Sequence, residues 1–200
     1  MKTLVSFIQA SLVLTASFST CMGAGVLYGN SVDLGGNSSH SSQALLGNRI
    51  TVDQSVNLQA AGIIFRTTGY NGNVGLYSSA VGSGLPNILM ATTGKFAVTQ
   101  SGRTEIPFST AITLSPGTYW FMAIYDASAS IGTTSVADTS NFTAFTGLNV
   151  NADLPSPIVD VITYSGKQFN YYLVTEAIPE PNIALLLLIS GMAWICRRNK

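Results

Sequence analysis

Hydrophobic positions in the central part of the chain alternate with polar ones over short stretches, and no long helical repeat is present. Strands are predicted for these runs, which Gly, Asn, Ser and Pro separate: residues 58–67, 73–78, 88–91, 95–99, 104–108, 111–114, 118–126, 142–145, 158–164 and 168–175. Many short strands with turn residues between them are typical of all-β proteins. We therefore expect an antiparallel β-sandwich or jelly-roll-like domain.

Two turns and one buried strand stand out within this pattern. Asn71-Gly72 predicts a tight turn before residues 73–78. Ser115-Pro116-Gly117 predicts another turn, with Pro and Gly well placed for it. The following stretch, TYWFMAIYD at 118–126, is apolar at both alternating sets of positions. It is therefore expected to be a central strand that is buried on two sides or covered by a loop.

The N-terminal segment has the three parts of an export signal. Lys2 supplies a positive charge, residues 4–18 are rich in apolar side chains, and small residues follow up to a plausible cleavage position at Ala24. The alternative is a buried first helix, which the Gly-rich sequence immediately downstream disfavours. Thr20 precedes Cys21 where a lipoprotein signal requires other residues, so lipidation is not expected. Residues 1–24 are assigned as a signal peptide.

The C-terminal segment combines a short apolar run with basic residues. Ile183–Cys196 contains 14 residues and no charge, which corresponds to about 21 Å of helix against a hydrocarbon core of about 30 Å. Arg197 and Arg198 follow it, which places the C-terminus in the cytoplasm. Taken alone, this run is a marginal transmembrane helix, and a plain tail anchor is one interpretation of it.

A second interpretation comes from the residues that precede the apolar run. Pro179 and Pro181 flank Glu180 and favour an extended, accessible strip. With the apolar run and the Arg197-Arg198 pair, this strip resembles the PEP-CTERM sorting signal of Gram-negative bacteria, with Ile178 in place of the usual Val. The resemblance implies recognition by exosortase, an integral-membrane cysteine protease or transpeptidase, and an association with exopolysaccharide. It divides the chain into a signal peptide, a β-sandwich domain at 25–177 and a sorting signal at 178–200.

The body also resembles a recurrent bacterial extracellular module over residues 56–126. The similarity rests on the stretches GLYSS, GLPNILMATTG, TEIPF and LSPGTYWFMAIYD. It implies a carbohydrate-binding or jelly-roll domain of the kind appended to secreted proteins, and it carries no defined catalytic motif.

Charge and cysteine content narrow the function classes. Charged residues make up 9% of the chain, against about 25% in typical soluble domains. Residues 25–180 contain five basic and nine acidic side chains, a balance of −4, which gives no electrostatic footprint for nucleic acid. Cys21 and Cys196 both lie in the terminal segments, so the body has no internal disulfide, Cys–metal site or thiol nucleophile.

No combination of residues in the body identifies a catalytic centre or a cofactor. His40 is the single histidine, in a polar stretch that predicts a solvated loop, and no G-x-S-x-G motif accompanies it. Glu105 and Asp126 could be drawn as paired carboxylates for glycoside cleavage, but we expect Glu105 to face solvent and Asp126 to cap a turn. The aspartates form no calcium-binding loop, so no metal is expected.

The expected function is that of an exported, non-enzymatic protein of the cell surface or extracellular matrix, structural or adhesive within exopolysaccharide. Its expected partners are exosortase and, before processing, the inner membrane through Ile183–Cys196. The alternative is a carbohydrate-binding module that retains matrix polysaccharide, with Tyr70 as the ring most likely to stack on a sugar because it lies in a predicted turn. A secreted polysaccharide hydrolase or lyase is the third hypothesis.

Overall fold

The structure, a computed structural model, describes residues 25–135, 142–164 and 166–178. These residues form thirteen strands and no helix. The strands are β1 Gly25–Gly29, β2 Gly36–His40, β3 Ala44–Val52, β4 Val56–Phe65, β5 Tyr70–Ser79, β6 Pro86–Val98, β7 Gly102–Leu114, β8 Gly117–Tyr125, β9 Ala129–Ser135, β10 Phe142–Thr146, β11 Ile162–Tyr164, β12 Lys167–Phe169 and β13 Tyr171–Ala177. The all-β prediction is confirmed.

The terminal segments predicted to direct export and sorting lie outside the described residues. These are the signal peptide at 1–24 and residues 179–200, which include the predicted apolar helix. Within the described part of the chain, no helix is long and apolar enough to cross a membrane.

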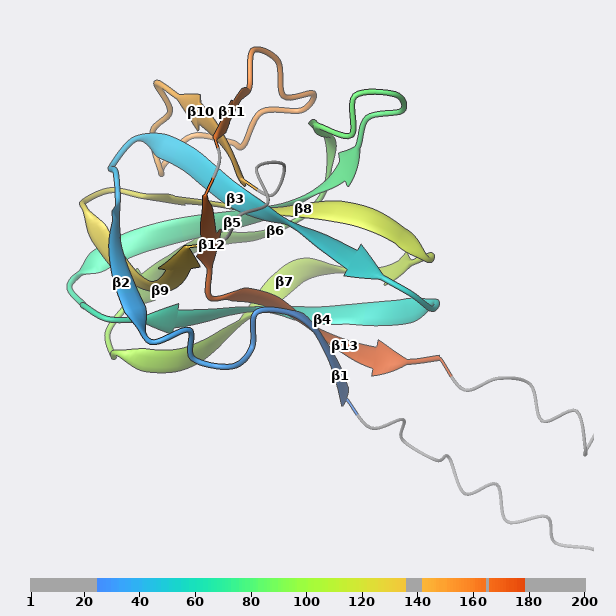
Figure 1. Cartoon of the computed structure of the whole chain (residues 1–200), viewed down its shortest axis with the longest axis horizontal. Helices are drawn as coiled ribbons and strands as arrows, with labels where there is room; N and C mark the ends of the chain where they lie inside the picture. Colours follow the sequence, from blue (N-terminus) through green and yellow to red (C-terminus); the bar gives the residue numbers. More distant parts are fainter. Residues whose placement is uncertain (1–24, 136–141, 165, 179–200) are drawn as a thin grey trace, which may run out of the picture.

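The strands form two antiparallel sheets that pack face to face (Figure 1). One sheet has the order β1-β13-β4-β9-β12, with β7 paired to β4 and β2 paired to β9; the other has the order β11-β10-β3-β8-β5-β6. A single hydrophobic core joins the two inner faces. Phe121 of β8, for example, stacks on Tyr171 of β13 with ring centroids 4.7 Å apart. The chain is therefore a two-layered β-sandwich.

A second hydrophobic cluster covers the outer face of the sheet that contains β8. Trp120 and Met122 of β8 and Tyr77 of β5 are buried there beneath Leu154 and Ile158 of the segment between β10 and β11. The indole nitrogen of Trp120 donates a hydrogen bond of 2.8 Å to the Gly84 carbonyl in the β5–β6 connection. The prediction that residues 118–126 form a strand buried on both faces is confirmed, and a loop supplies the second cover.

Several predicted strand boundaries are wrong because the strands are longer and less regular than the polar interruptions indicate. Residues 88–91 and 95–99 belong mainly to the single strand β6, and 104–108 and 111–114 both lie in β7. Register shifts in the pairing of β5 with β6 and of β7 with β4 accommodate the irregular positions as β-bulges.

Two predicted elements are replaced by other structure. Asn71-Gly72 lies inside β5, and the turn comes earlier, where Gly69 has a φ of +91°. Of the strand predicted at 158–164, only Ile162–Tyr164 is a strand.

The first and last strands of the folded body are neighbours in the same sheet. β1 pairs with β13 in antiparallel register, with Gly25 opposite Glu176. The first described residue and the end of the last strand therefore lie side by side at one edge of the sandwich (Figure 1). β10 and β11 lie on the other side of the molecule in this view.

Candidate functional site

A pocket of about 460 Å³ opens where β2 turns into β3, beside β10, β11 and β12. Its volume is within the range of about 300–1,000 Å³ that is typical of small-ligand sites. The lining comes from segments far apart in the sequence: Ser38, Ser39, Ser41, Ser42, Gln43, Ala44, Leu46, Ala144, Thr146, Gly147, Tyr164, Lys167 and Phe169. Sheet pairing brings these segments together, because β10 pairs with β3 while both β2 and β12 pair with β9.

Hydroxyl groups and one ammonium dominate the polar part of the lining. Four serines and Thr146 contribute aliphatic hydroxyls, and Lys167 contributes the charge. The Lys167 ammonium donates a hydrogen bond of 3.0 Å to the Ser38 hydroxyl. Each hydroxyl both donates and accepts, and the ammonium donates only, so the wall can match ligands that present many hydroxyl and carbonyl oxygens.

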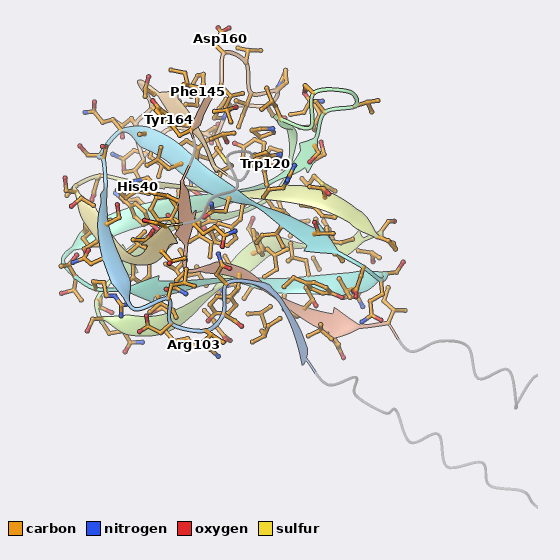
Figure 2. All side chains as sticks on the ribbon, viewed as in Figure 1. His40, Arg103, Trp120, Phe145, Asp160 and Tyr164 are labelled. Atoms are coloured by element: carbon orange, nitrogen blue, oxygen red, sulfur yellow. The ribbon has the colours of Figure 1, made fainter. Side chains whose placement is uncertain are left out.

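Aromatic and aliphatic side chains form the remainder of the lining. Phe169 is 2% exposed, and its ring stacks on the Tyr171 ring with a distance of 5.3 Å between the centroids. Tyr164 is 44% exposed and offers ring surface at the pocket. An exposed ring beside many hydroxyls suits a ligand with both apolar faces and polar edges. Figure 2 shows Tyr164 on the same side of the molecule as His40 and across the sandwich from Arg103.

Gln43 fixes two walls of the pocket to one another through its backbone. Its φ of +62° is uncommon for a residue with a side chain. Its amide donates to the Tyr125 carbonyl at 3.3 Å, and its own carbonyl accepts hydrogen bonds of 3.1 Å from Gly147 and Leu148. The β2–β3 turn is therefore tied to the end of β10 by backbone hydrogen bonds.

His40, predicted to lie in a solvated loop, is instead fully buried at the end of β2. Its ring meets the Tyr125 ring edge to face, with centroids 4.7 Å apart, and its Nδ1 lies 3.1 Å from the Ser41 carbonyl oxygen. Burial lowers the pKa of His40 to about 4, so the ring is neutral at pH 7. His40 anchors the chain between Ser39 and Ser41, both of which line the pocket.

Tyr70, predicted to be an exposed sugar-stacking ring, is 6% exposed and belongs to the core. It contacts Phe65 and Tyr125 edge to face, and its hydroxyl donates to the Thr67 carbonyl at 3.0 Å. The expectation of exposure is wrong because Tyr70 begins a strand instead of lying in a turn. The exposed ring at the pocket is Tyr164. The sequence pattern predicts a strand at this position, but it does not distinguish Tyr164 from the other tyrosines.

The two carboxylates considered for glycoside cleavage have structural surroundings and do not line the pocket. Glu105 is exposed, as expected, and accepts a long hydrogen bond of 3.4 Å from the Tyr172 hydroxyl. Asp126 accepts hydrogen bonds of 2.8 and 2.6 Å from the backbone and side chain of Asn71. These bonds lower the pKa of Asp126, the opposite of what a general acid requires.

Other predicted site residues are not placed by the structure. Pro179, Glu180, Pro181, Arg197 and Arg198 lie outside the described residues, so the sorting motif stays a prediction. Among residues 25–135, 142–164 and 166–178, no group of three or more His, Cys, Asp or Glu side chains is arranged to hold a metal ion.

Comparison with known proteins identifies a similar fold without a family. No family model matches the chain, and no curated protein matches it in sequence. The solved structure of the cysteine protease and lectin-like domains of Cwp84, a surface-layer-associated protein of Clostridium difficile, is similar with a TM-score of 0.54 over 77% of this chain. Sequence identity is 11%, and the match spans 36% of that chain's length. At this identity the similarity concerns the fold.

Proposed function

We propose that this protein is an exported, non-enzymatic adhesion protein that holds matrix polysaccharide in the pocket between β2, β3, β10, β11 and β12. The observation that carries the proposal is the combination of five aliphatic hydroxyl side chains, one ammonium and the exposed Tyr164 ring in one pocket. Sugar units have an apolar face that suits an aromatic ring and hydroxyl edges that suit such a wall.

The composition of the pocket favours binding over hydrolysis. Glycosidases generally use a pair of carboxyl groups beside the scissile bond. Among the residues that the structure describes, those that line this pocket include no Asp, Glu, His or Cys. Glu105 and Asp126, the carboxylates considered from the sequence, lie elsewhere and are engaged by Tyr172 and Asn71. The proposal is also compatible with the fold similarity to a structure that includes a lectin-like domain of a surface-layer-associated protein.

Export and sorting complete the proposal. The signal peptide at 1–24 delivers the body across the membrane, and the strip Ile178-Pro179-Glu180-Pro181 is the processing motif for exosortase. Because β13 ends at Ala177 and pairs with β1, the motif follows the folded body almost directly. Processing then releases a domain that associates with exopolysaccharide at the cell surface or in the matrix.

Affinity electrophoresis tests the binding function. The mature protein, purified from the producing cells, is run through gels that contain the cells' own matrix polysaccharide or one of a panel of neutral and acidic polysaccharides. Tyr164→Ala is expected to weaken binding about three- to tenfold, since a ring contact of this kind is worth about 0.5–1.5 kcal/mol. The matched control is Ile162→Ala, on the same strand and 54% exposed but not part of the pocket lining.

The outcomes separate the three hypotheses. Binding that Tyr164→Ala weakens and Ile162→Ala leaves unchanged supports adhesion through the pocket. Failure to bind every polysaccharide would contradict it and leave a scaffolding protein. New reducing ends released from a bound polysaccharide would contradict the non-enzymatic assignment.

Intact mass spectrometry of the mature protein tests the sorting step. Loss of the residues that follow the Pro-Glu-Pro strip is expected. A mature protein that ends in Arg197-Arg198-Asn199-Lys200 would contradict processing and return the tail to the status of a plain anchor.

A further inference from the structure

Of the described residues that line the pocket, Lys167 is the one with a charged side chain. No carboxylate of the described residues forms an ion pair with it, and its ammonium donates a hydrogen bond of 3.0 Å to the neutral Ser38 hydroxyl. Acidic side chains outnumber basic ones by nine to five between residues 25 and 180.

Three of the other basic side chains of the body have contacts that explain their positions. Arg66 pairs with Asp33 through both of its terminal nitrogens. Arg103 donates to the Ser31 carbonyl and lies 5.1 Å from the centre of the Tyr172 ring. Lys95 donates a hydrogen bond of 2.6 Å to the Asn151 side chain. Lys167 differs from these three in its place, because it lines a pocket and no carboxylate of the described residues forms an ion pair with it.

A neutral sugar needs no charged partner, whereas an acidic sugar unit does. An ammonium attracts a carboxylate or sulfate group within hydrogen-bonding distance, and such charge-assisted bonds are about twice as strong as neutral ones. No Asp or Glu of the described residues lines the pocket, so none of them repels an anionic ligand there. The serine hydroxyls can meet the remaining hydroxyls of the same unit.

We propose that the pocket selects an anionic saccharide unit, such as a uronic acid residue, through the Lys167 ammonium. This inference rests on the proposed polysaccharide-binding function and specifies its ligand class. Lys167 holds the acidic group, Ser38 orients the ammonium, and Tyr164 supports the ring of the same or the adjoining sugar.

The test compares a carboxylated polymer (polygalacturonate), a sulfated polymer (dextran sulfate) and neutral dextran by affinity electrophoresis of the mature protein. Lys167→Met keeps the length of the side chain and removes the charge. It is expected to weaken binding to an acidic polymer about tenfold, which corresponds to about 1.4 kcal/mol, because the charge-assisted hydrogen bond to the acidic group is lost. Lys167→Arg should retain most of the affinity, and Lys95→Met, which removes a lysine outside the pocket, is the control.

Ionic strength provides a second readout. Added salt should weaken the binding of the acidic polymer to the unmodified protein and to Lys95→Met, and have little effect on the residual binding of Lys167→Met. A stronger Lys167→Met effect on polygalacturonate than on dextran sulfate identifies a carboxylate as the favoured group; the reverse order identifies a sulfate.

Failure of this inference is distinguishable from failure of the proposed function. If Tyr164→Ala weakens binding but Lys167→Met does not, or if neutral dextran binds as tightly as the acidic polymers, selection of an anionic unit is overturned and polysaccharide binding stands. If neither these polymers nor the cells' own matrix polysaccharide binds, both are overturned.

Discussion

The Lys167 ammonium on β12 and the Ser38 hydroxyl on β2 lie 3.0 Å apart, although 129 positions separate the two residues in the chain. The two strands flank β9, with which both pair in antiparallel register. The contact fixes the direction of a long, flexible side chain at the pocket. In the proposed binding mode, Ser38 is a positioning residue and Lys167 is the group that contacts the ligand.

Removing the Ser38 hydroxyl should weaken ligand binding less than removing the charge. Ser38→Ala leaves the ammonium in place and removes the hydrogen bond that Lys167 donates to the Ser38 hydroxyl. The affinity for an acidic polysaccharide should therefore fall less than threefold, whereas Lys167→Met should lower it about tenfold. Affinity electrophoresis checks the difference. The control is Ser109→Ala on β7, which removes a hydrogen bond to the Thr92 carbonyl far from the pocket lining. Equal losses for Ser38→Ala and Lys167→Met would contradict the division of roles.

Acidification between pH 7 and pH 5 should destabilise the protein through His40. Its pKa is about 4 in the folded state, below the ordinary value of 6.5, so the unfolded chain takes up the proton first as the pH falls. The stabilisation by the neutral ring is fully present above about pH 6.5 and is lost as the pH falls towards 4. A change of about 2 kcal/mol in the free energy of unfolding is expected between pH 7 and pH 5.

Urea unfolding at several pH values measures this effect, and NMR titration isolates its source. The chain contains one histidine, so its imidazole signals are unambiguous and should titrate near pH 4 in the folded protein. The pKa of Asp33 is lowered to about 2 by its hydrogen bonds with Arg66 and Gly35. Asp33 therefore titrates below the range from pH 7 to pH 5 in which the effect of His40 is measured. An imidazole that titrates near 6.5 in the folded protein would contradict the burial of His40.

The strand with the clearest sequence signal, β8, could be predicted because both of its faces are apolar. β3 pairs with β8 and is equally central, yet it was missed because Asn48 and Arg49 interrupt its hydrophobic alternation. Asn48 is nevertheless buried, and its side-chain oxygen accepts a 2.7 Å hydrogen bond from the Phe169 amide. A buried polar residue that is satisfied by a distant backbone group carries no local signal of burial.

The pocket could not be predicted because sheet pairing assembles it from separate segments, and no single segment has a distinctive motif. The polar stretch around His40 indicated a solvated loop. In the structure it is the strand β2, in which exposure alternates and His40 is the one fully buried residue. The exposure predicted for Tyr70 is wrong because Asn71-Gly72 is a strong local signal for a turn. In the structure these residues form part of β5, which pairs with β6 and β8, and this pairing overrides the local preference.

Asn170 should be one of the most sensitive polar positions for stability. It lies between β12 and β13 and is fully buried. Its side chain donates to the Asn30 and Val32 carbonyls at 3.0 and 2.6 Å and accepts from the Leu34 amide at 3.1 Å. Asn170→Ala leaves these three backbone groups unpaired, so the free energy of unfolding should fall by about 3 kcal/mol or more.

Urea unfolding of Asn170→Ala beside Asn151→Ala checks this expectation. Asn151 is exposed, and its side chain contacts Lys95 and not the backbone of another strand, so its replacement should change the free energy of unfolding by less than about 0.5 kcal/mol. Equal effects of the two substitutions would show that Asn170 does not hold the β1–β2 connection.

Gly47 should tolerate no side chain, because β8 approaches its backbone closely. A Cβ atom at this position would lie 1.9 Å from the Phe121 carbonyl oxygen and 2.5 Å from the Met122 sulfur. Gly47→Ala must displace backbone in a central pair of strands, and a loss of about 3 kcal/mol or more in the free energy of unfolding is expected. At Gly117 a Cβ atom would meet nothing nearer than 3.8 Å, so Gly117→Ala is the matched control. A Gly47→Ala protein with unchanged stability would contradict the pairing of β3 with β8.

Processing at both ends should leave a mature protein with no thiol and one tryptophan. Cys21 lies in the predicted signal peptide, and Cys196 and Trp194 lie in the predicted sorting segment. Trp120 would then be the remaining tryptophan; because it is buried, with its indole bonded to Gly84, its fluorescence should be blue-shifted until the protein unfolds. Thiol titration in guanidinium and the tryptophan absorbance of the purified protein measure both quantities. One thiol with two tryptophans would indicate a retained C-terminal segment, whereas one thiol with one tryptophan would indicate that Cys21 stays and that only the tail is removed.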